Sequence, residues 1–164
     1  MQIYVNSFEL KPSPIKGIGV FSKVTLPGEA VIFEFTGRLI RKSEVSKPPP
    51  VDFSSYKQIT ADSYLSTSGA YCDYFNHSCN ANCYLDIVGT RAFLITLHQI
   101  NPGDEITWDY STTCNETKEE WSLSCNCGAF ACRKIISGFQ YLDDKKKKEY
   151  IGLNIVPDYI VKGN

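Results

Sequence analysis

The sequence predicts a mainly β domain built from short strands. Runs of apolar, β-branched and aromatic residues recur along the chain, and turn-forming proline and glycine residues separate them. Many short strands between turn signals favour a compact all-β or β-rich domain with little helix. At 164 residues the chain is long enough to enclose one hydrophobic core.

The first expected strands alternate with clear breaks. A strand opens at residues 3–5, and the sequence Lys-Pro-Ser-Pro at 11–14 breaks it. Residues 17–21 form a glycine-flanked strand, in which the missing Cβ atoms let the backbone approach a ligand. Residues 26–29 are a turn, because proline presets φ and glycine can take a positive φ. The next strand spans residues 30–40 and is interrupted at Gly37.

The middle and the end of the chain continue this pattern. Residues 47–50, Lys-Pro-Pro-Pro, are expected to form an exposed loop or a short polyproline segment. Residues 101–104, Asn-Pro-Gly-Asp, are a strong turn signal. The four lysines at 145–148 are typical of a solvated helix face, with nuclear import or nucleosome contact as the alternative. Further strands are expected at residues 56–65, at 92–97 and from the start of 106–110.

Composition limits the classes of function. The formal net charge of −1 argues against bulk electrostatic capture of nucleic acid. No stretch is long and apolar enough to span a membrane, and the N-terminus lacks a secretory signal pattern, so we expect a soluble protein. Seven cysteines are an odd number, and a fully paired disulfide framework would leave one over. We therefore expect a reducing, intracellular compartment.

Four of the seven cysteines have the spacing of a structural zinc site. Cys79 lies in mid-chain, and a C-x-C-x4-C cluster follows near the C-terminus at Cys125, Cys127 and Cys132. Four thiolates are the number that a closed tetrahedral zinc site takes. Such a site would tie the C-terminal segment back onto the middle of the fold. The other cysteines are expected to be free thiols that pack in the interior: Cys72, Cys83 and Cys114.

Five motifs follow one another in a fixed order. They are GIGVF at 17–21, EFTG at 34–37, NHSC at 76–79, GDEITWDY at 103–110 and the cysteine triplet at 125–132. With these motifs in this order, the chain resembles the SET-domain protein lysine methyltransferases with a zinc-binding post-SET segment. The resemblance covers roughly residues 12–136, and it lacks the cysteine-rich pre-SET region that some members carry.

The resemblance implies a mainly β, β-clip fold. In that fold the NHSC segment and the C-terminal motif form a threaded, knot-like crossing, and the post-SET segment binds zinc. The implied organisation is a SET domain at residues 1–120, a post-SET zinc segment at 121–138 and a C-terminal tail at 139–164 packed on the SET body. The tail could also cover the substrate groove, and the sequence leaves both roles open.

The resemblance also implies a site with two approaches. S-adenosylmethionine, which becomes S-adenosylhomocysteine, would lie on one face, and the substrate lysine would arrive from the other through a narrow channel. Tyr110 would be the catalytic tyrosine beside the transferred methyl group, and Phe35, Trp108 and Tyr110 would wall the channel. The implied cofactor-binding residues are Lys16, Gly17, Ile18, Gly19, Tyr56, Asn76, His77, Tyr110 and Ile135.

Elementary chemistry explains what such a site must do. A lysine ammonium has no lone pair, and its pKa is normally about 10.4. An apolar, aromatic channel and a neighbouring sulfonium both disfavour the charged form and lower that pKa. Methyl transfer then depends mainly on in-line alignment within a rigid channel. We expect the Tyr110 hydroxyl to orient the cofactor and the amine, the proton to leave to water, and the zinc to be purely structural.

The chain departs from the usual family pattern at four positions. Phe35 and Arg38 replace the tyrosine and the second glutamate of a Glu-Tyr-x-Gly-Glu strand, so a channel hydroxyl is missing. Asp73 stands where an arginine often precedes the Asn-His pair. Trp108, two residues before Tyr110, cannot offer a phenolic hydroxyl to hold a channel water. It therefore resembles the phenylalanine class, and we expect di- or trimethylation to be permitted.

Three functions follow as hypotheses. The first is a protein lysine N-methyltransferase whose partner is a lysine-containing protein or peptide, most commonly a histone tail in this family. No membrane partner is expected, direct nucleic-acid binding is not favoured, and the location would be nuclear in a eukaryotic cell. The second is a catalytically silent SET-like module that binds a lysine peptide. The third is a small zinc-stabilised structural protein without a ligand.

Overall fold

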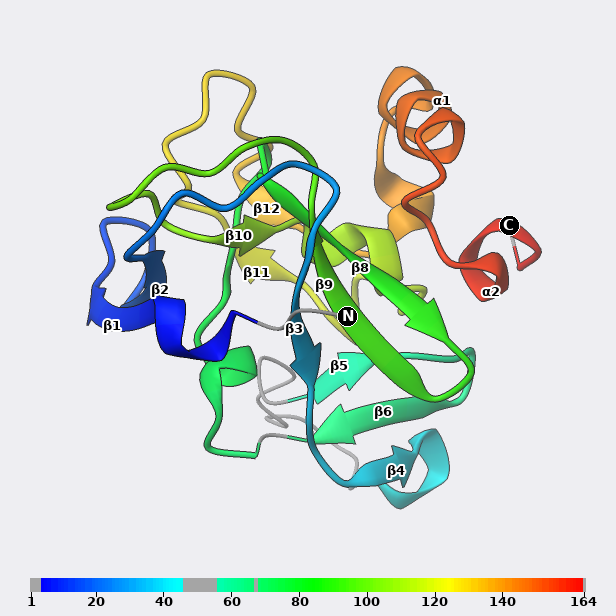
Figure 1. Cartoon of the computed structure of the whole chain (residues 1–164). Helices are drawn as coiled ribbons and strands as arrows, with labels where there is room; N and C mark the ends of the chain where they lie inside the picture. Colours follow the sequence, from blue (N-terminus) through cyan, green and yellow to red (C-terminus); the bar gives the residue numbers. More distant parts are fainter. Residues whose placement is uncertain (1–3, 46–55, 67, 164) are drawn as a thin grey trace.

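The computed structural model describes residues 4–45, 56–66 and 68–163, and within them the chain is mainly β, as predicted. The loop expected at residues 47–50 lies outside the described residues. The described strands form four small sheets (Figure 1). Their bounds are β1 Phe8–Pro12, β2 Ile18–Ser22, β3 Val31–Phe35, β4 Leu39–Arg41, β5 Tyr56–Gln58, β6 Ser63–Ser66, β7 Asn76–His77, β8 Cys83–Val88, β9 Arg91–Thr96, β10 Thr107–Trp108, β11 Leu123–Ser124 and β12 Ile135–Ile136.

Short helical turns and two α-helices complete the described chain. The α-helices are both C-terminal and lie on the right in Figure 1, α1 above α2, away from the β1–β2 hairpin. None of the described helices is both long enough and apolar enough to cross a bilayer. Their bounds, with 3-10 turns labelled η, are η1 Val5–Ser7, η2 Lys42–Glu44, η4 Tyr71–Asp73, η5 Tyr110–Thr113, η6 Phe139–Tyr141, α1 Asp144–Gly152 and α2 Asp158–Val161.

The N-terminal segment differs from the prediction. Residues 5–7 form the 3-10 turn η1 rather than a strand, and β1 starts only at Phe8. The reason is the partner strand: β1 pairs antiparallel with β2 from Phe8 opposite Ser22 to Pro12 opposite Ile18. Proline has no N–H to donate, and it is tolerated here because it ends the strand. The glycine-flanked strand predicted at 17–21 corresponds to β2 and is confirmed.

The central sheet has the strand order β3-β9-β8-β10-β7. The strand predicted at 92–97 is confirmed as β9, but its antiparallel partner β8 was not predicted. β8 reads Cys-Tyr-Leu-Asp-Ile-Val, and its side chains begin by alternating between buried and half-buried positions, the period expected of a strand. The short strand β10 runs parallel to β7, which places Thr107 and Trp108 directly beside Asn76 and His77.

A three-stranded sheet, β4-β6-β5, lies below the central sheet in the view of Figure 1. The strand predicted at 56–65 is two strands, β5 and β6, joined by a turn. The Thr60 hydroxyl donates to the Asp62 carboxylate at 2.9 Å, and such short polar side chains favour turns. The break predicted at Gly37 is confirmed, because there the chain leaves the central sheet as β3 and enters the lower sheet as β4.

Two predicted turns are present. The turn at 101–104 is closed by the Asp104 N–H donating to the Asn101 carbonyl at 3.1 Å, with Gly103 at φ 89°. At 26–29, however, the positive φ of 57° belongs to Glu29 rather than to Gly28. The Glu29 N–H donates to the Thr96 carbonyl at 2.9 Å, and this bond to β9 holds the left-handed conformation.

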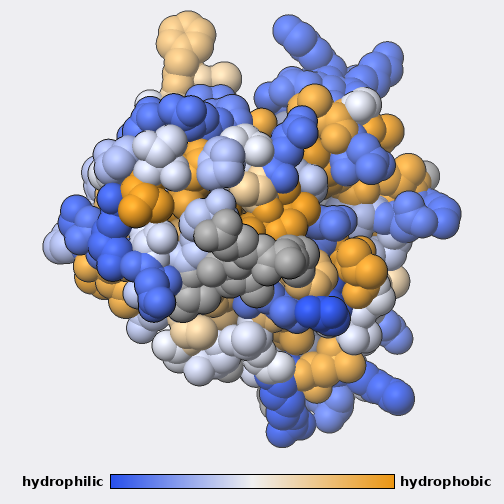
Figure 2. Space-filling model, viewed as in Figure 1, coloured by the Kyte–Doolittle hydropathy of each residue, from blue (hydrophilic) through white to orange (hydrophobic). Residues whose placement is uncertain are grey.

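The C-terminal segment after residue 138 packs against the rest of the chain. Phe139, Tyr150 and Ile160 are buried in a cluster of their own that also contacts Tyr84 of β8. The Tyr159 hydroxyl donates to the carbonyl of Thr113 at 2.6 Å. The lysine run lies on α1, as predicted, and Figure 2 shows hydrophilic side chains projecting at the upper right, where α1 lies in Figure 1.

Candidate functional site

The four cysteines predicted to bind metal come together in space. Their sulfur atoms all lie within 4.8 Å of one another, with Cys125 Sγ 3.8 Å from Cys79 Sγ and 3.6 Å from Cys132 Sγ. Four sulfurs around one zinc at about 2.3 Å would be about 3.8 Å apart, so the cluster has the dimensions of a tetrahedral site. The cluster could hold a metal ion, and it ties the segment at 125–132 to the NHSC motif.

Backbone N–H groups donate hydrogen bonds to two sulfur atoms of the cluster. The Cys79 N–H donates to Cys127 Sγ at 3.4 Å, and the Arg133 N–H donates to Cys79 Sγ at 3.4 Å. Burial raises the pKa of the Cys127 thiol, but the N–H groups of Cys79 and Ala129, together with Cys125 and Cys132, outweigh it and lower the pKa to about 6. Burial raises the pKa of the Cys79 thiol to about 11 and also raises that of Cys125, so of these three cysteines Cys127 is the one whose surroundings favour the thiolate that a metal ligand requires.

His77 links the cysteine cluster to Tyr110. Its Nδ1 accepts a hydrogen bond from the Tyr110 N–H at 3.2 Å, so the proton of the neutral ring belongs to Nε2, which lies 3.3 Å from Cys79 Sγ. Burial lowers the pKa of His77 to about 4, and the ring is therefore neutral at neutral pH. The Nε2–H group therefore points at Cys79 Sγ and would fix the position of that sulfur if the cluster held a metal ion.

A cavity of about 290 Å³ opens beside the Asn-His pair. Its walls come from three places: the turn between β1 and β2, the segment through β7, and the paired strands β11 and β12. Three predicted cofactor residues from the first region and two from the second line it together with Tyr110. The residues that line it include Lys16, Gly17, Ile18, Asp73, Asn76, His77, Tyr110 and Ile136.

Asn76 holds the first wall of this cavity in place. Its side-chain NH₂ group donates to the carbonyl of Lys16 at 3.1 Å, to the carbonyl of Ile18 at 3.2 Å and to Glu105 Oε1 at 2.8 Å. Glu105 also accepts from the Ser13 hydroxyl at 2.9 Å. The asparagine therefore positions the glycine-containing turn through its amide nitrogen.

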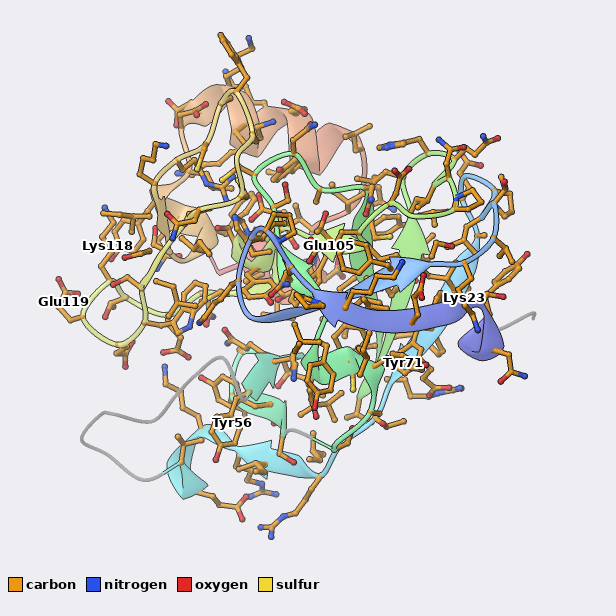
Figure 3. All side chains as sticks on the ribbon, turned by 90° about the vertical axis from the view of Figure 1, so that its left-hand side faces the viewer. Lys23, Tyr56, Tyr71, Glu105, Lys118 and Glu119 are labelled. Carbon is orange, nitrogen blue, oxygen red and sulfur yellow. The ribbon has the colours of Figure 1, made fainter. Side chains whose placement is uncertain are left out.

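Glu105 was not among the predicted site residues, although it lies inside the GDEITWDY motif. A Cβ atom added at Gly19 would collide with its carboxylate, so only glycine lets Glu105 reach Asn76. Figure 3 labels Glu105 beside the β1–β2 hairpin, well away from Tyr56 on the lower sheet. The sequence did offer one signal for this contact. Gly19 in the GIGVF motif leaves space for a side chain, and Glu105 in the GDEITWDY motif supplies a carboxylate.

A second, smaller cavity of about 50 Å³ shares Tyr110 with the larger one. It is lined by aromatic rings, by the half-buried carboxylate of Asp73 and by the buried carboxylate of Glu116. Among the described residues, only Asp73 and Tyr110 line both this cavity and the larger one. Its walls are made of Tyr56, Lys57, Gln58, Tyr64, Cys72, Asp73, Trp108, Tyr110, Thr113, Cys114, Glu116 and Trp121.

Tyr110 is held rigidly between the two cavities. Its hydroxyl donates to the carbonyl of Phe75 at 2.7 Å, and its ring lies 4.8 Å from the Trp108 ring and 5.4 Å from the His77 ring. Burial raises the pKa of the Tyr110 phenol, so the hydroxyl stays protonated near neutral pH. The phenol is consequently a fixed hydrogen-bonding group rather than a base.

Four predicted site residues occupy places that differ from their expected roles. Phe35 does not line the channel: it packs behind Trp108, with their ring centroids 6.1 Å apart. Tyr56 lines the narrow cavity and not the larger one. Gly19 makes room for Glu105 instead of lining the larger cavity. Ile135 is 57% exposed, while the next residue along β12, Ile136, is buried and lines the larger cavity, because side chains alternate along a strand.

An ion pair and a hydrogen bond on one buried carboxylate join the site to the residues that follow the cysteine cluster and to α1. Asp109, the residue before Tyr110, accepts two hydrogen bonds from the Arg133 guanidinium and one from the Tyr150 hydroxyl at 2.9 Å. Burial alone would raise the pKa of Asp109, but the neighbouring His77, the charge and hydrogen bonds of Arg133 and the hydrogen bond from Tyr150 together lower it. Neither Arg133 nor Tyr150 was singled out from the sequence.

Comparisons with known proteins agree on one family. A family profile described as "SET domain" matches residues 17–111. The "Histone-lysine N-methyltransferase trr" of Drosophila melanogaster is 30% identical over 81% of this chain and 6% of its own length. The human "Histone-lysine N-methyltransferase 2D" is 25% identical over 79% of this chain and 2% of its own length. The chain thus spans only a small part of these curated relatives.

Solved structures give the same answer for the fold. A crystal structure of KRYPTONITE in complex with mCHG DNA and SAH has a TM-score of 0.66 at 25% identity, covering 83% of this chain and 30% of that one. A second KRYPTONITE structure, in complex with mCHH DNA, H3(1–15) peptide and SAH, has a TM-score of 0.63 at 23% identity, covering 79% and 29%. The second likeness bears on the fold alone.

Proposed function

The chain belongs to the SET-domain family, and on that basis we propose that it is an S-adenosylmethionine-dependent protein lysine N-methyltransferase. The observation that carries the proposal is the pair of cavities that meet at Tyr110. A methyl transfer needs donor and acceptor to approach in line from opposite sides, and two cavities with one shared wall provide that arrangement.

The larger cavity fits the methyl donor. At about 290 Å³ it approaches the usual size of a cofactor site, and its walls offer backbone groups at Lys16 and Gly17 and the Asn76 and His77 segment. S-adenosylmethionine supplies a methyl group on a positively charged sulfur. Residues of this chain would bind it, with Ile136 as the apolar contact from β12.

The narrow cavity fits the lysine side chain. Trp108 and Tyr110 form an aromatic wall that takes the amine out of water, and a sulfonium in the larger cavity would repel a positive charge. Both effects lower the pKa of a lysine entering the narrow cavity. The Tyr110 hydroxyl, held by the Phe75 carbonyl, positions the reacting groups without taking the proton, which leaves to water. Phe35 supports Trp108 from behind and thereby fixes the shape of the channel.

The cysteine cluster is proposed to hold one structural zinc ion on Cys79, Cys125, Cys127 and Cys132. Four thiolates leave no open coordination position, so the metal takes no part in the transfer. Its role is to hold the post-SET segment at 121–138 over the larger cavity. The SET domain at 1–120 and the C-terminal tail at 139–164 complete the proposed organisation.

Histone lysine is the proposed substrate class, because the curated relatives carry the name histone-lysine N-methyltransferase and one KRYPTONITE structure includes an H3 peptide. A nuclear location in a eukaryotic cell goes with that substrate. Di- or trimethylation is permitted in this proposal, since Trp108 offers the narrow cavity no phenolic hydroxyl. Mass spectrometry that found only monomethyl product after long incubation would refute that last point.

Radiolabelled methyl transfer to a core-histone mixture tests the activity. We expect transfer by the wild type and a strong loss in Tyr110→Phe, with binding of S-adenosylhomocysteine retained in both. Stabilisation by S-adenosylhomocysteine in a thermal shift, without transfer to histones or to a lysine-peptide array, would favour the silent binding module. If S-adenosylhomocysteine did not stabilise the protein at all, the methyltransferase and the silent binding module would both be ruled out, and a structural protein would remain.

A further inference from the structure

We propose that Tyr150 and Tyr159 of the C-terminal segment are positioning residues that fix the orientation of Tyr110. They do so by holding the two ends of η5, the 3-10 turn that begins at Tyr110. The inference rests on the proposed function and deepens it, because it gives the segment after residue 138 a part in methyl transfer.

The start of η5 is capped by Asp109, and Tyr150 holds that cap. Asp109 Oδ1 accepts from the Ser111 N–H at 3.0 Å, and the Asp109 carbonyl accepts from the Thr112 N–H at 3.0 Å. The Tyr150 hydroxyl, which comes from α1, donates to the other carboxylate oxygen, Oδ2, at 2.9 Å. Because an N-cap side chain fixes where a helical turn begins, Tyr150 acts one residue away from Tyr110.

The end of η5 is held by Tyr159, which comes from α2. Its hydroxyl lies 2.6 Å from the carbonyl oxygen of Thr113 and 3.1 Å from that of Gln58, so two acceptors share one proton. The last carbonyls of a helical turn have no partner within the turn. Gln58 ends β5, an edge strand among the described strands, and an edge strand leaves outer carbonyls without a neighbouring strand. Tyr159 thus joins the end of η5 to a wall of the narrow cavity.

Both phenols are suited to be permanent donors. Burial raises the pKa of each, so the two hydroxyls keep their protons near neutral pH. They reach η5 from separate helices (Figure 1), and one buried cluster that includes Phe139 and Ile160 packs these helices together. Since such a packed cluster moves little, η5 and Tyr110 cannot tilt without breaking at least one of the two contacts.

Two conservative variants test the proposal in the full chain. Tyr150→Phe and Tyr159→Phe each keep the aromatic ring and remove only the hydroxyl. Tyr141→Phe is the matched control, because Tyr141 lies in the same segment and its hydroxyl accepts from the Lys118 N–H at 3.4 Å, in an exposed loop. All four proteins are compared by circular dichroism before the measurements below.

Amide hydrogen exchange followed by NMR gives the first readout. The reporter is the Thr112 N–H in η5, and the reference is the Thr96 N–H, which donates to the Ala30 carbonyl at 3.1 Å in the central sheet. Losing one hydrogen bond should speed exchange at Thr112 about tenfold in either variant and leave exchange at Thr96 as in the wild type. Tyr141→Phe should change neither rate. The measurement uses no methyl donor and no substrate, so it is independent of the methyl-transfer assay.

The second readout separates turnover from binding. In methyl transfer to histones, each variant should lower kcat about tenfold, while KM for the histone and the affinity for S-adenosylhomocysteine stay within about twofold. The reason is that a tilted Tyr110 spoils the alignment of the reacting groups without closing either cavity. A purely structural role would instead lower Tm and leave the kcat of the folded protein unchanged.

Three results would overturn the proposal. They are unchanged exchange at Thr112 in both variants, equal acceleration at Thr112 and Thr96, and a wild-type kcat in both variants of an active enzyme. Tyr150→Phe leaves Asp109 its contacts with Arg133, so the carboxylate is not stranded. If one variant does not fold, the other decides, because it acts on the opposite end of η5. A wild type that transferred no methyl group would refute the proposed function, and the exchange rates would still show whether the two hydroxyls hold η5.

Discussion

The guanidinium of Arg133 donates to both carboxylate oxygens of Asp109, at 2.7 and 2.8 Å. Asp109 immediately precedes Tyr110, while the backbone N–H of Arg133 donates to Cys79 Sγ. One buried ion pair thus joins the segment that carries the tyrosine to the cysteine cluster. The Tyr150 hydroxyl adds α1 to the same carboxylate, so three distant parts of the chain converge there.

Breaking this pair should destabilise the fold strongly. Asp109 is only 3% exposed, and Arg133→Met leaves its charge buried without a guanidinium partner. We expect the free energy of unfolding in urea to fall by about 3 kcal/mol. Arg91→Met is the matched control, because Arg91 contacts Glu34 with the same two-bond geometry on the exposed surface. That control should change stability little, and equal losses in the two variants would contradict the role given to burial.

Gly19→Ala should weaken the binding of S-adenosylhomocysteine in the larger cavity without unfolding the protein. The added Cβ would push away the Glu105 carboxylate, which then loses its bond to Asn76. Losing such a charge-assisted hydrogen bond corresponds to about tenfold in affinity for S-adenosylhomocysteine, measurable by calorimetry. Gly152→Ala, at the end of α1 with open space around it, is the control and should bind as the wild type does. Unchanged affinity in Gly19→Ala would argue against this account of the turn.

Metal content tests the cysteine cluster. We expect one zinc per chain in the wild type and a substantial loss in Cys127→Ser. Cys83→Ala should keep its zinc, because Cys83 is buried in the central sheet outside the cluster. Losing a tightly bound ion worth about 4 kcal/mol should lower Tm by about 10 °C. Wild-type protein with much less than one zinc per folded chain would rule out the proposed site.

The Lys57–Asp73 pair predicts a pH dependence of stability. Burial raises the pKa of Asp73, but the hydrogen bond and charge of Lys57, with the N–H groups of Ser68 and Gly69, outweigh it and lower the pKa below its usual value. A carboxyl with a lower pKa in the folded state contributes stability above the pKa of the unfolded state, about 3.9. That contribution is lost as the pH falls through the folded-state pKa.

The measurement compares wild type with Asp73→Asn by urea unfolding between pH 6 and pH 3. The stability difference should be constant in the upper part of this range and should shrink below about pH 4. Protonation of the cysteine thiolates affects both proteins and cancels in the difference. A difference that stays constant down to pH 3, or grows, would contradict the lowered pKa.

Much of the site was predictable because its motifs are short and local. Asn76, His77 and Tyr110 lie within or beside strands that a residue-by-residue reading can find, and the spacing of the last three cysteines indicates a metal site by itself. Errors arose where the answer depends on which face of an element a side chain occupies. Ile135 and Ile136 are neighbours in sequence, but only the second faces the cavity, and that alternation is set by the pairing of β12 with β11.

The long-range contacts could not be read from the chain. Asp109 with Arg133, Asn76 with Glu105, and Lys57 with Asp73 join residues from separate segments, and each partner alone is an ordinary polar residue. Their energies depend on burial, since the same ion pair contributes little in water and much in the interior. Burial is a property of the folded chain and not of the local sequence.

The motifs and their order were enough to predict the family, the mainly β class and the four cysteines that cluster. Short-range residue patterns encode strands and metal ligands directly. Only the folded chain decided that Tyr110 and Asp73 line both cavities and that Lys57 pairs with Asp73 in the wall of the smaller one. The physical reason is that a cavity is the space left between side chains from distant segments. Its shape and charge exist only once packing has brought those segments together.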